Sequence, residues 1–269
     1  MLSKPRPDDR PPRRRLSLRQ EYEEFILQRI EDYKDQLSRT DLLAIADEAV
    51  RELEVGPEGQ LVLTEVLVLE HVDRLIMRRL KLPTFRRWRQ RHMKLRRAQR
   101  EPTHWGIPGD TPLVDLIYRL EPDDLVLVVG CAVSPTAYFI AAHDVAVLLI
   151  DDDLPGIEGV ESRAAAEGLG SRVSAMVVSL GSWFPDITPA LVVLGSSALG
   201  ALDAPTRLEL ARTLQDRTVR GGVHLILAAD PSPDIHALAP EALQSQYRQW
   251  SVERGPKRGK ARWLLATKP

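Results

Sequence analysis

The sequence predicts an α/β protein: a helical N-terminal region, then a doubly wound, mostly parallel sheet that ends in a C-terminal antiparallel hairpin. Two observations support this prediction. Before residue 100, apolar residues recur at spacings of three and four, as they do along one face of a helix. After residue 112, short apolar runs alternate with helical segments, a pattern typical of a parallel sheet with helices on both faces.

Composition divides the chain into four segments. Residues 1–19 are rich in proline and arginine and predict a basic arm with few side chains to bury. Residues 20–100 are the helical region, and residues 101–112 are a linker punctuated by proline and glycine. Residues 113–269 are expected to form the α/β domain. A chain of 269 residues is long enough for such a domain and a smaller companion.

Three helices are expected in the first part of the helical region. One apolar stripe starts at Tyr22, and Thr40 and Asp41 offer caps for a second helix. The turn at residues 56–59 ends that helix. Residues 61–80 are predicted to be mostly helical after a strand-like start.

Residues 83–100 contain no acidic residue and are expected to form a fourth, basic helix. Arginines cover much of its surface, and aromatic side chains lie among them. This helix and the arm are expected to bind a partner. The expected contact residues are Arg13, Arg14, Arg15, Arg86, Trp88, Arg89, Arg96, Arg97 and Arg100. The alternative is a solvated face whose arginines pair with acidic neighbours, such as the glutamates of the first helix.

A basic surface of this kind can bind an acidic protein, anionic lipid headgroups or nucleic-acid phosphates. The sequence has no recognisable nucleic-acid module and no repeated aromatic platform for bases, so nucleic acid is the less favoured partner. We expect protein partners in a larger assembly, with an anionic membrane surface as a further partner.

Composition excludes several other classes of protein. The single cysteine, Cys131, excludes an intramolecular disulfide and a cysteine-cluster metal site, and the six histidines have no metal-ligand spacing, so no metal is expected. The N-terminus lacks the apolar run of a secretory signal. The apolar residues 125–142 are interrupted by Gly130 and Pro135, so no transmembrane segment is expected. A cytoplasmic location follows.

Within the α/β domain, the apolar runs expected to be parallel strands are residues 125–129, 145–150, 173–178, 191–194 and 223–228. The helices expected between them are residues 137–142, 157–169 and 205–218. Two further strands, at about residues 250–254 and 261–267, would form the closing hairpin.

The order of these elements resembles that of the class I, Rossmann-like, S-adenosylmethionine (SAM)-dependent methyltransferases. The run VLVVGCAVSPTA at residues 126–137 corresponds to the family's first strand and glycine-rich turn. The run VAVLLIDDD at residues 145–153 corresponds to its second strand and to the acid that holds the cofactor ribose. The run ARTLQDRTVRGGVHLILA at residues 211–228 is the most similar piece. The resemblance covers residues 111–269 and implies a methyltransferase-like fold.

The resemblance also implies a cofactor site, and this chain departs from it. A glycine-rich turn brings backbone close to the ligand and offers free N–H groups. Only Gly130 remains, because the family's other two glycines fall at Ala132 and Ser134, and Pro135 has no N–H to donate. The vestigial cofactor site would comprise Gly130, Ala132, Asp151, Asp152 and Leu180, with Asp151 at the ribose position. Whether a cofactor fits depends on the volume that Val133 and Pro135 occupy.

These departures favour a non-catalytic accessory or scaffold subunit with a degenerate methyltransferase-like domain and no cofactor. Its basic segments would dock onto a larger assembly, and the resemblance suggests a membrane-bound energy-converting complex with the chain peripheral on its cytoplasmic face. No catalytic residue is assigned. The alternative is an active SAM-dependent methyltransferase, in which Gly130, Asp151 and the loop at residues 179–181 would hold SAM.

Overall fold

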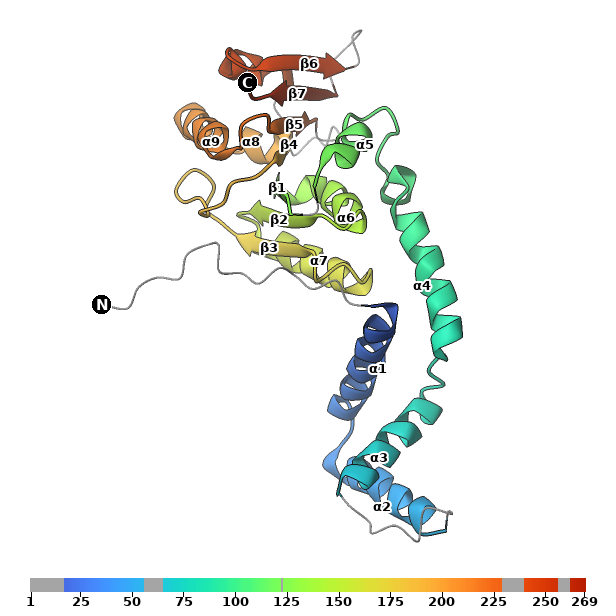
Figure 1. Cartoon of the computed structure of the whole chain (residues 1–269). Coiled ribbons are helices and arrows are strands. Elements are labelled where there is room, and N and C mark those ends of the chain that lie inside the picture. The colour runs from blue at the N-terminus through green and yellow to red at the C-terminus, as the bar shows by residue number, and fades with distance from the viewer. Residues whose placement is uncertain (1–16, 56–64, 122, 229–239, 256–261) are drawn as a thin grey trace, which may run out of the picture. The chain divides into compact units, whose positions relative to one another are not determined.

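The computed structural model describes residues 17–55, 65–121, 123–228, 240–255 and 262–269 (Figure 1). Arg13, Arg14 and Arg15, the predicted turn at residues 56–59 and the strand-like start of the third helix lie outside these residues. The chain divides into two compact units, Met1–Leu95 and Arg96–Pro269. Each unit is described by itself.

The first unit is helical, as the sequence predicts. Its helices are α1 (Leu18–Asp35), α2 (Arg39–Val55), α3 (Glu65–Arg79) and the first part of α4 (Phe85–Gln99). Their apolar stripes meet in one core, which comprises Ile26, Ile30, Ile45, Ala49, Val72, Leu75 and Ile76. A capping box starts α1, because the Ser17 hydroxyl accepts the N–H of Gln20 and the Gln20 side chain accepts the N–H of Ser17.

The caps predicted for the second helix were wrong by two to three residues. The Ser38 hydroxyl, and not Thr40 or Asp41, accepts a backbone N–H at the start of α2, that of Asp41 at 3.2 Å. The acids of α2 pair instead with α3. Glu52 lies 2.5 Å from Arg78 and 2.9 Å from His71, and Glu48 pairs with Arg79.

The second unit is built on one mixed sheet of seven strands in the order β3-β2-β1-β4-β5-β7-β6. The strands are β1 (Leu125–Val129), β2 (Ala146–Asp151), β3 (Val173–Val177), β4 (Leu191–Gly195), β5 (Val223–Leu227), β6 (Ser251–Gly255) and β7 (Trp263–Thr267). The first five pair in parallel, and the β6–β7 hairpin joins antiparallel to β5 through β7. The predicted doubly wound sheet with its closing hairpin is confirmed.

Helical segments cover both faces of this sheet. They are η3 (Pro102–Trp105), α5 (Leu113–Leu116), η4 (Ile117–Arg119), η5 (Cys131–Val133), α6 (Ser134–Ala142), α7 (Leu154–Ala166), α8 (Ser196–Gly200), α9 (Ala204–Arg217) and η6 (Pro240–Tyr247). Helices α6 and α7 lie on one face of the sheet and α9 lies on the other (Figure 1). Side chains of α6 and α7 belong to one buried core, and those of α9 and η6 belong to a second. Successive residues of β1 point to opposite faces, and both faces are buried, which explains the unbroken apolar run.

Two elements differ from expectation in extent. The segment predicted as a linker, residues 101–112, is packed into the second unit, because Trp105 and Ile107 are buried in its core and the Trp105 indole N–H donates to the Gln99 carbonyl at 2.7 Å. The helix expected at residues 157–169 instead begins at Leu154 and ends at Ala166. Gly168 then has a φ of 70°, a left-handed conformation that ends helices.

Candidate functional site

The strand order reverses between β1 and β4, and in doubly wound sheets ligands bind outside the carboxyl ends of the strands at such a point. Two segments meet there: the β1 turn (residues 130–133) and α8, which follows β4 directly. Gly130 has a φ of 103°, which favours glycine. A Cβ on Gly130 would lie 3.1 Å from the Cβ of Ala198, so α8 packs closely against the turn.

Two apolar side chains, those of Val133 and Ala198, pack at the ends of β1 and β4. Val133 is buried, with 7% of its surface exposed. A Cβ on Gly195, the last residue of β4, would lie 3.4 Å from both methyl carbons of Val133. Val133 therefore lies over the end of β4 in van der Waals contact, and Ala198 lies over Gly130.

The carboxylate at the end of β2 is bound by the protein's own backbone. Oδ2 of Asp151 accepts the N–H of Cys131 at 2.5 Å, and Oδ1 accepts the N–H of Asp152 at 2.7 Å and that of Asp153 at 3.4 Å. Asp151 is 9% exposed. Its charge therefore stabilises the β1 turn and the start of α7.

The pKa values of this cluster follow from the same hydrogen bonds and from burial. Burial alone would raise the pKa of Asp151, but the hydrogen bonds from Cys131 and its neighbours outweigh burial, so the pKa is lowered. A hydrogen bond to Asp151 raises the pKa of Asp152. Burial, and then the charge of Asp151, raises the pKa of the Cys131 thiol to about 12. Cys131 is therefore a protonated thiol at neutral pH and no nucleophile.

The other predicted cofactor residues do not complete a site. Ala132 and Asp152 are exposed. Leu180 is buried in the core on the α9 side of the sheet, where it packs with the β1 and β4 side chains. The next residue, Gly181, packs against Thr206 of α9, since a Cβ there would lie 2.1 Å from the Thr206 methyl carbon. Sequence reasoning missed Ala198, whose only signal was an apolar residue shortly after the fourth strand.

Three features of the switch point bear on whether SAM could bind there. Val133 packs at the end of β4 and Ala198 packs against Gly130. The carboxylate of Asp151 accepts hydrogen bonds from backbone N–H groups, and Pro135, in the first turn of α6, offers no N–H.

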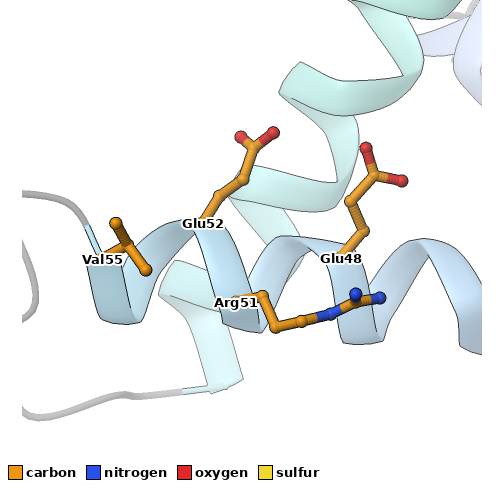
Figure 2. A pocket seen from close by; sticks show the side chains of 4 residues that line it. All are labelled: Glu48, Arg51, Glu52 and Val55. Atoms are coloured by element: carbon orange, nitrogen blue, oxygen red, sulfur yellow. The ribbon is translucent and has the colours of Figure 1, made fainter.

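Two surface hollows stand out in the described part of the chain, and neither includes a residue of the switch point. One, of about 470 Å³, is lined by α9 and η6. The other, of about 500 Å³, lies on α2 and is lined by Glu48, Arg51, Glu52 and Val55 (Figure 2). Figure 2 shows Glu48 and Glu52 on the same side of α2, where each pairs with an arginine of α3. These acids are therefore structural.

The predicted partner residues have different environments. Trp88, which was expected to contact a partner, is instead 8% exposed. Its ring packs on Tyr22 at 5.5 Å and on Phe25 at 6.2 Å between ring centres. Arg100 pairs with Asp144 at 2.9 Å and donates to the Ala142 carbonyl, so it holds the second unit together.

The remaining basic residues of α4 divide by exposure. Arg86, Arg89 and Arg97 are exposed on α4, whereas Arg96 is partly buried.

No group of three or more metal-ligating side chains occurs in the described residues. Within the same residues, no helix has the length and apolar character needed to cross a bilayer.

Comparison with solved structures finds methyltransferases. TehB from Haemophilus influenzae aligns over 61% of this chain and 63% of its own, at 18% identity and a TM-score of 0.47. The glycopeptide N-methyltransferase MtfA complexed with S-adenosyl-L-methionine aligns over 60% of this chain and 88% of its own, at 15% identity and a TM-score of 0.47. An O-methyltransferase family protein from Burkholderia thailandensis aligns over 58% of this chain and 55% of its own, at 18% identity and a TM-score of 0.45.

This chain thus spans less than two thirds of the length of TehB and of the Burkholderia protein. No protein-family model and no curated protein matches the chain. The fold assignment depends on the sheet itself. Its parallel strands, its switch point and its closing hairpin give the second unit the methyltransferase-like Rossmann fold that the sequence predicts.

Proposed function

We propose that this chain is a non-catalytic accessory or scaffold subunit, in which a degenerate methyltransferase-like domain has a structural role. Its exposed basic residues on α4 would dock it onto a larger assembly. A fold alone does not determine activity, so the proposal depends on the residues at the switch point.

One observation supports the proposal: Val133 packs at the end of β4 and Ala198 packs against Gly130, at the strand ends where a bound SAM would have to lie. Placing SAM there would require Val133 to leave its buried position, which would expose apolar surface to water. A ribose would also compete with the three backbone N–H groups that already donate to the Asp151 carboxylate. Both changes oppose binding.

Calorimetric titration of the full chain with SAM, and separately with S-adenosylhomocysteine, tests this proposal. We expect no saturable heat at millimolar concentrations of either compound. Thermal unfolding with and without each compound gives a second readout, because a ligand that binds the folded state raises the melting temperature. Saturable binding with a micromolar dissociation constant would overturn the proposal and favour the alternative, an active SAM-dependent methyltransferase.

A further inference from the structure

Within the described residues of the first unit, α4 carries a dense group of exposed positive charges. We define its basic face as Arg86, Arg87, Arg89, Arg91 and Lys94, all of them exposed. The geometry points to a nucleic-acid binding surface, which contacts the phosphodiester backbone and so needs neither the recognition module nor the aromatic base platform that the sequence lacks. This inference names the partner of the docking surface in the proposed function and therefore rests on that function.

The basic face has no internal counter-charge. Within the described residues, none of its five side chains forms an ion pair. The arginines of α3 differ, because Arg74, Arg78 and Arg79 each pair with a glutamate. The glutamates of α1 do not neutralise the face either: Glu23 pairs with Arg19, and Glu21 lies 3.0 Å from His92. A dense charge without partners requires an external anion or solvent counterions.

The apolar side chains of α4 do not suit a lipid surface. A helix that lies in a membrane interface inserts aromatic and aliphatic side chains among the lipids. Here the rings of Phe85 and Trp88 pack on Tyr22 of α1, at 5.4 Å and 5.5 Å between ring centres. Beside the basic face, the exposed large apolar residues of α4 are Met93 and Leu95. Because its aromatic side chains pack on α1, α4 can attract an anionic membrane by charge but can insert few apolar side chains among the lipids.

The same shortage of apolar surface disfavours an acidic protein. Specific protein interfaces have an apolar centre with aromatic anchors and a polar rim. The exposed large apolar side chains of α4 are Met93 and Leu95, and neither is aromatic. A nucleic-acid backbone needs no such centre, because its affinity comes mainly from charge and from counterion release.

The type and spacing of the side chains fit phosphates. Four of the five residues are arginines, whose planar guanidinium donates two parallel hydrogen bonds to one phosphate. Arg87, Arg91 and Lys94 follow the i, i+4, i+7 spacing and form one row along the helix. From Arg86 to Lys94 the face is about 12 Å long at 1.5 Å per residue, enough to meet several consecutive phosphates.

The test measures binding of the full chain to short fluorescein-labelled duplexes of RNA and DNA by fluorescence anisotropy over a range of salt concentrations. The test variant is Arg86→Gln, Arg87→Gln, Arg91→Gln and Lys94→Gln combined. The control variant removes the same charge from other helices of the unit: Arg29→Gln, Arg39→Gln, Arg51→Gln and Arg74→Gln. Circular dichroism and thermal unfolding of both variants establish that the fold is kept.

We expect the test variant to lose at least tenfold in affinity for both duplexes, and the control variant to lose much less. The slope of log Kd against log salt should fall by about 0.9 for each duplex phosphate contact that is removed. Four outcomes would overturn the inference: equal losses in the two variants, no loss of duplex binding in either variant, binding of phosphatidylserine vesicles but not of the duplexes, or equally tight binding of polyglutamate. None of these outcomes affects the calorimetric test with SAM, so the two proposals can fail separately.

Discussion

His224 is a fully buried histidine in the middle of β5, and a chain of hydrogen bonds fixes its state. The Thr218 hydroxyl donates to the Leu214 carbonyl at 2.6 Å, so its oxygen accepts from Nε2 of His224 at 2.8 Å. Nδ1 then accepts from the Tyr247 hydroxyl at 2.9 Å. The imidazole is therefore neutral, and burial lowers its pKa to about 3. This network links β5 to the end of α9 and to η6.

The buried histidine predicts a pH dependence of stability. Between pH 6.5, near the pKa of an unfolded histidine, and pH 3, the unfolded chain binds a proton at His224 that the folded chain does not. Acidification across this interval therefore lowers the free energy of unfolding, by up to about 1.4 kcal/mol per pH unit from this residue. His224→Gln keeps one donor and one acceptor but does not titrate.

The measurement is urea unfolding of the full chain from pH 7 to pH 4, for the wild type, for His224→Gln and for the exposed His104→Gln as control. We expect the His224→Gln variant to lose part of the pH dependence and the control to keep it. Identical pH profiles for all three proteins would show that His224 is not the titrating group.

At the scale of elements, α4 is held to α1 by an aromatic cluster of Tyr22, Phe25, Phe85 and Trp88, with His92 stacked on Trp88 at 4.4 Å. Trp88→Ala should lower the free energy of unfolding of the first unit by about 3–5 kcal/mol, because it removes a buried indole and leaves a cavity. The control is Met93→Ala on the same helix, where 50% of the side chain is exposed. It should change stability by less than about 0.5 kcal/mol.

Differential scanning calorimetry of the full chain measures both variants. A Trp88→Ala protein as stable as the Met93→Ala protein would contradict the packing of α4 on α1. In that case Trp88 would again be a candidate for partner contact.

The elements that sequence predicted well are those whose signal is local. The central strands β1 and β4 are buried on both faces, so each appears as an unbroken apolar run, such as Leu125–Val129. The start of the second helix was predicted less accurately, because Ser38, Thr40 and Asp41 are all good N-caps and the choice among them depends on tertiary packing. Trp88 was misassigned because its contact, Tyr22, lies 66 residues earlier in the chain.

At the scale of the whole molecule, the methyltransferase-like fold could be predicted and the state of its cofactor site only in part. The loss of glycines in the β1 turn is visible in the sequence. The packing of Val133 near Gly195 and of Ala198 near Gly130 is not visible there, since it depends on the register of β1 against β4. A net charge of −1 likewise conceals the basic face, because acids elsewhere in the chain offset it.

In the proposed function, Val133 occupies the place that a cofactor would need, and the methyl resonances of Val133 test this proposal most directly. We propose carbon-13 methyl spectra of the full chain labelled at valine, with the Val133 signals assigned by their absence from a Val133→Ala variant. Adding S-adenosylhomocysteine to millimolar concentration should leave these signals unshifted. A saturable shift of the Val133 methyls would contradict the account, because it would place the ligand in the crevice that this side chain fills.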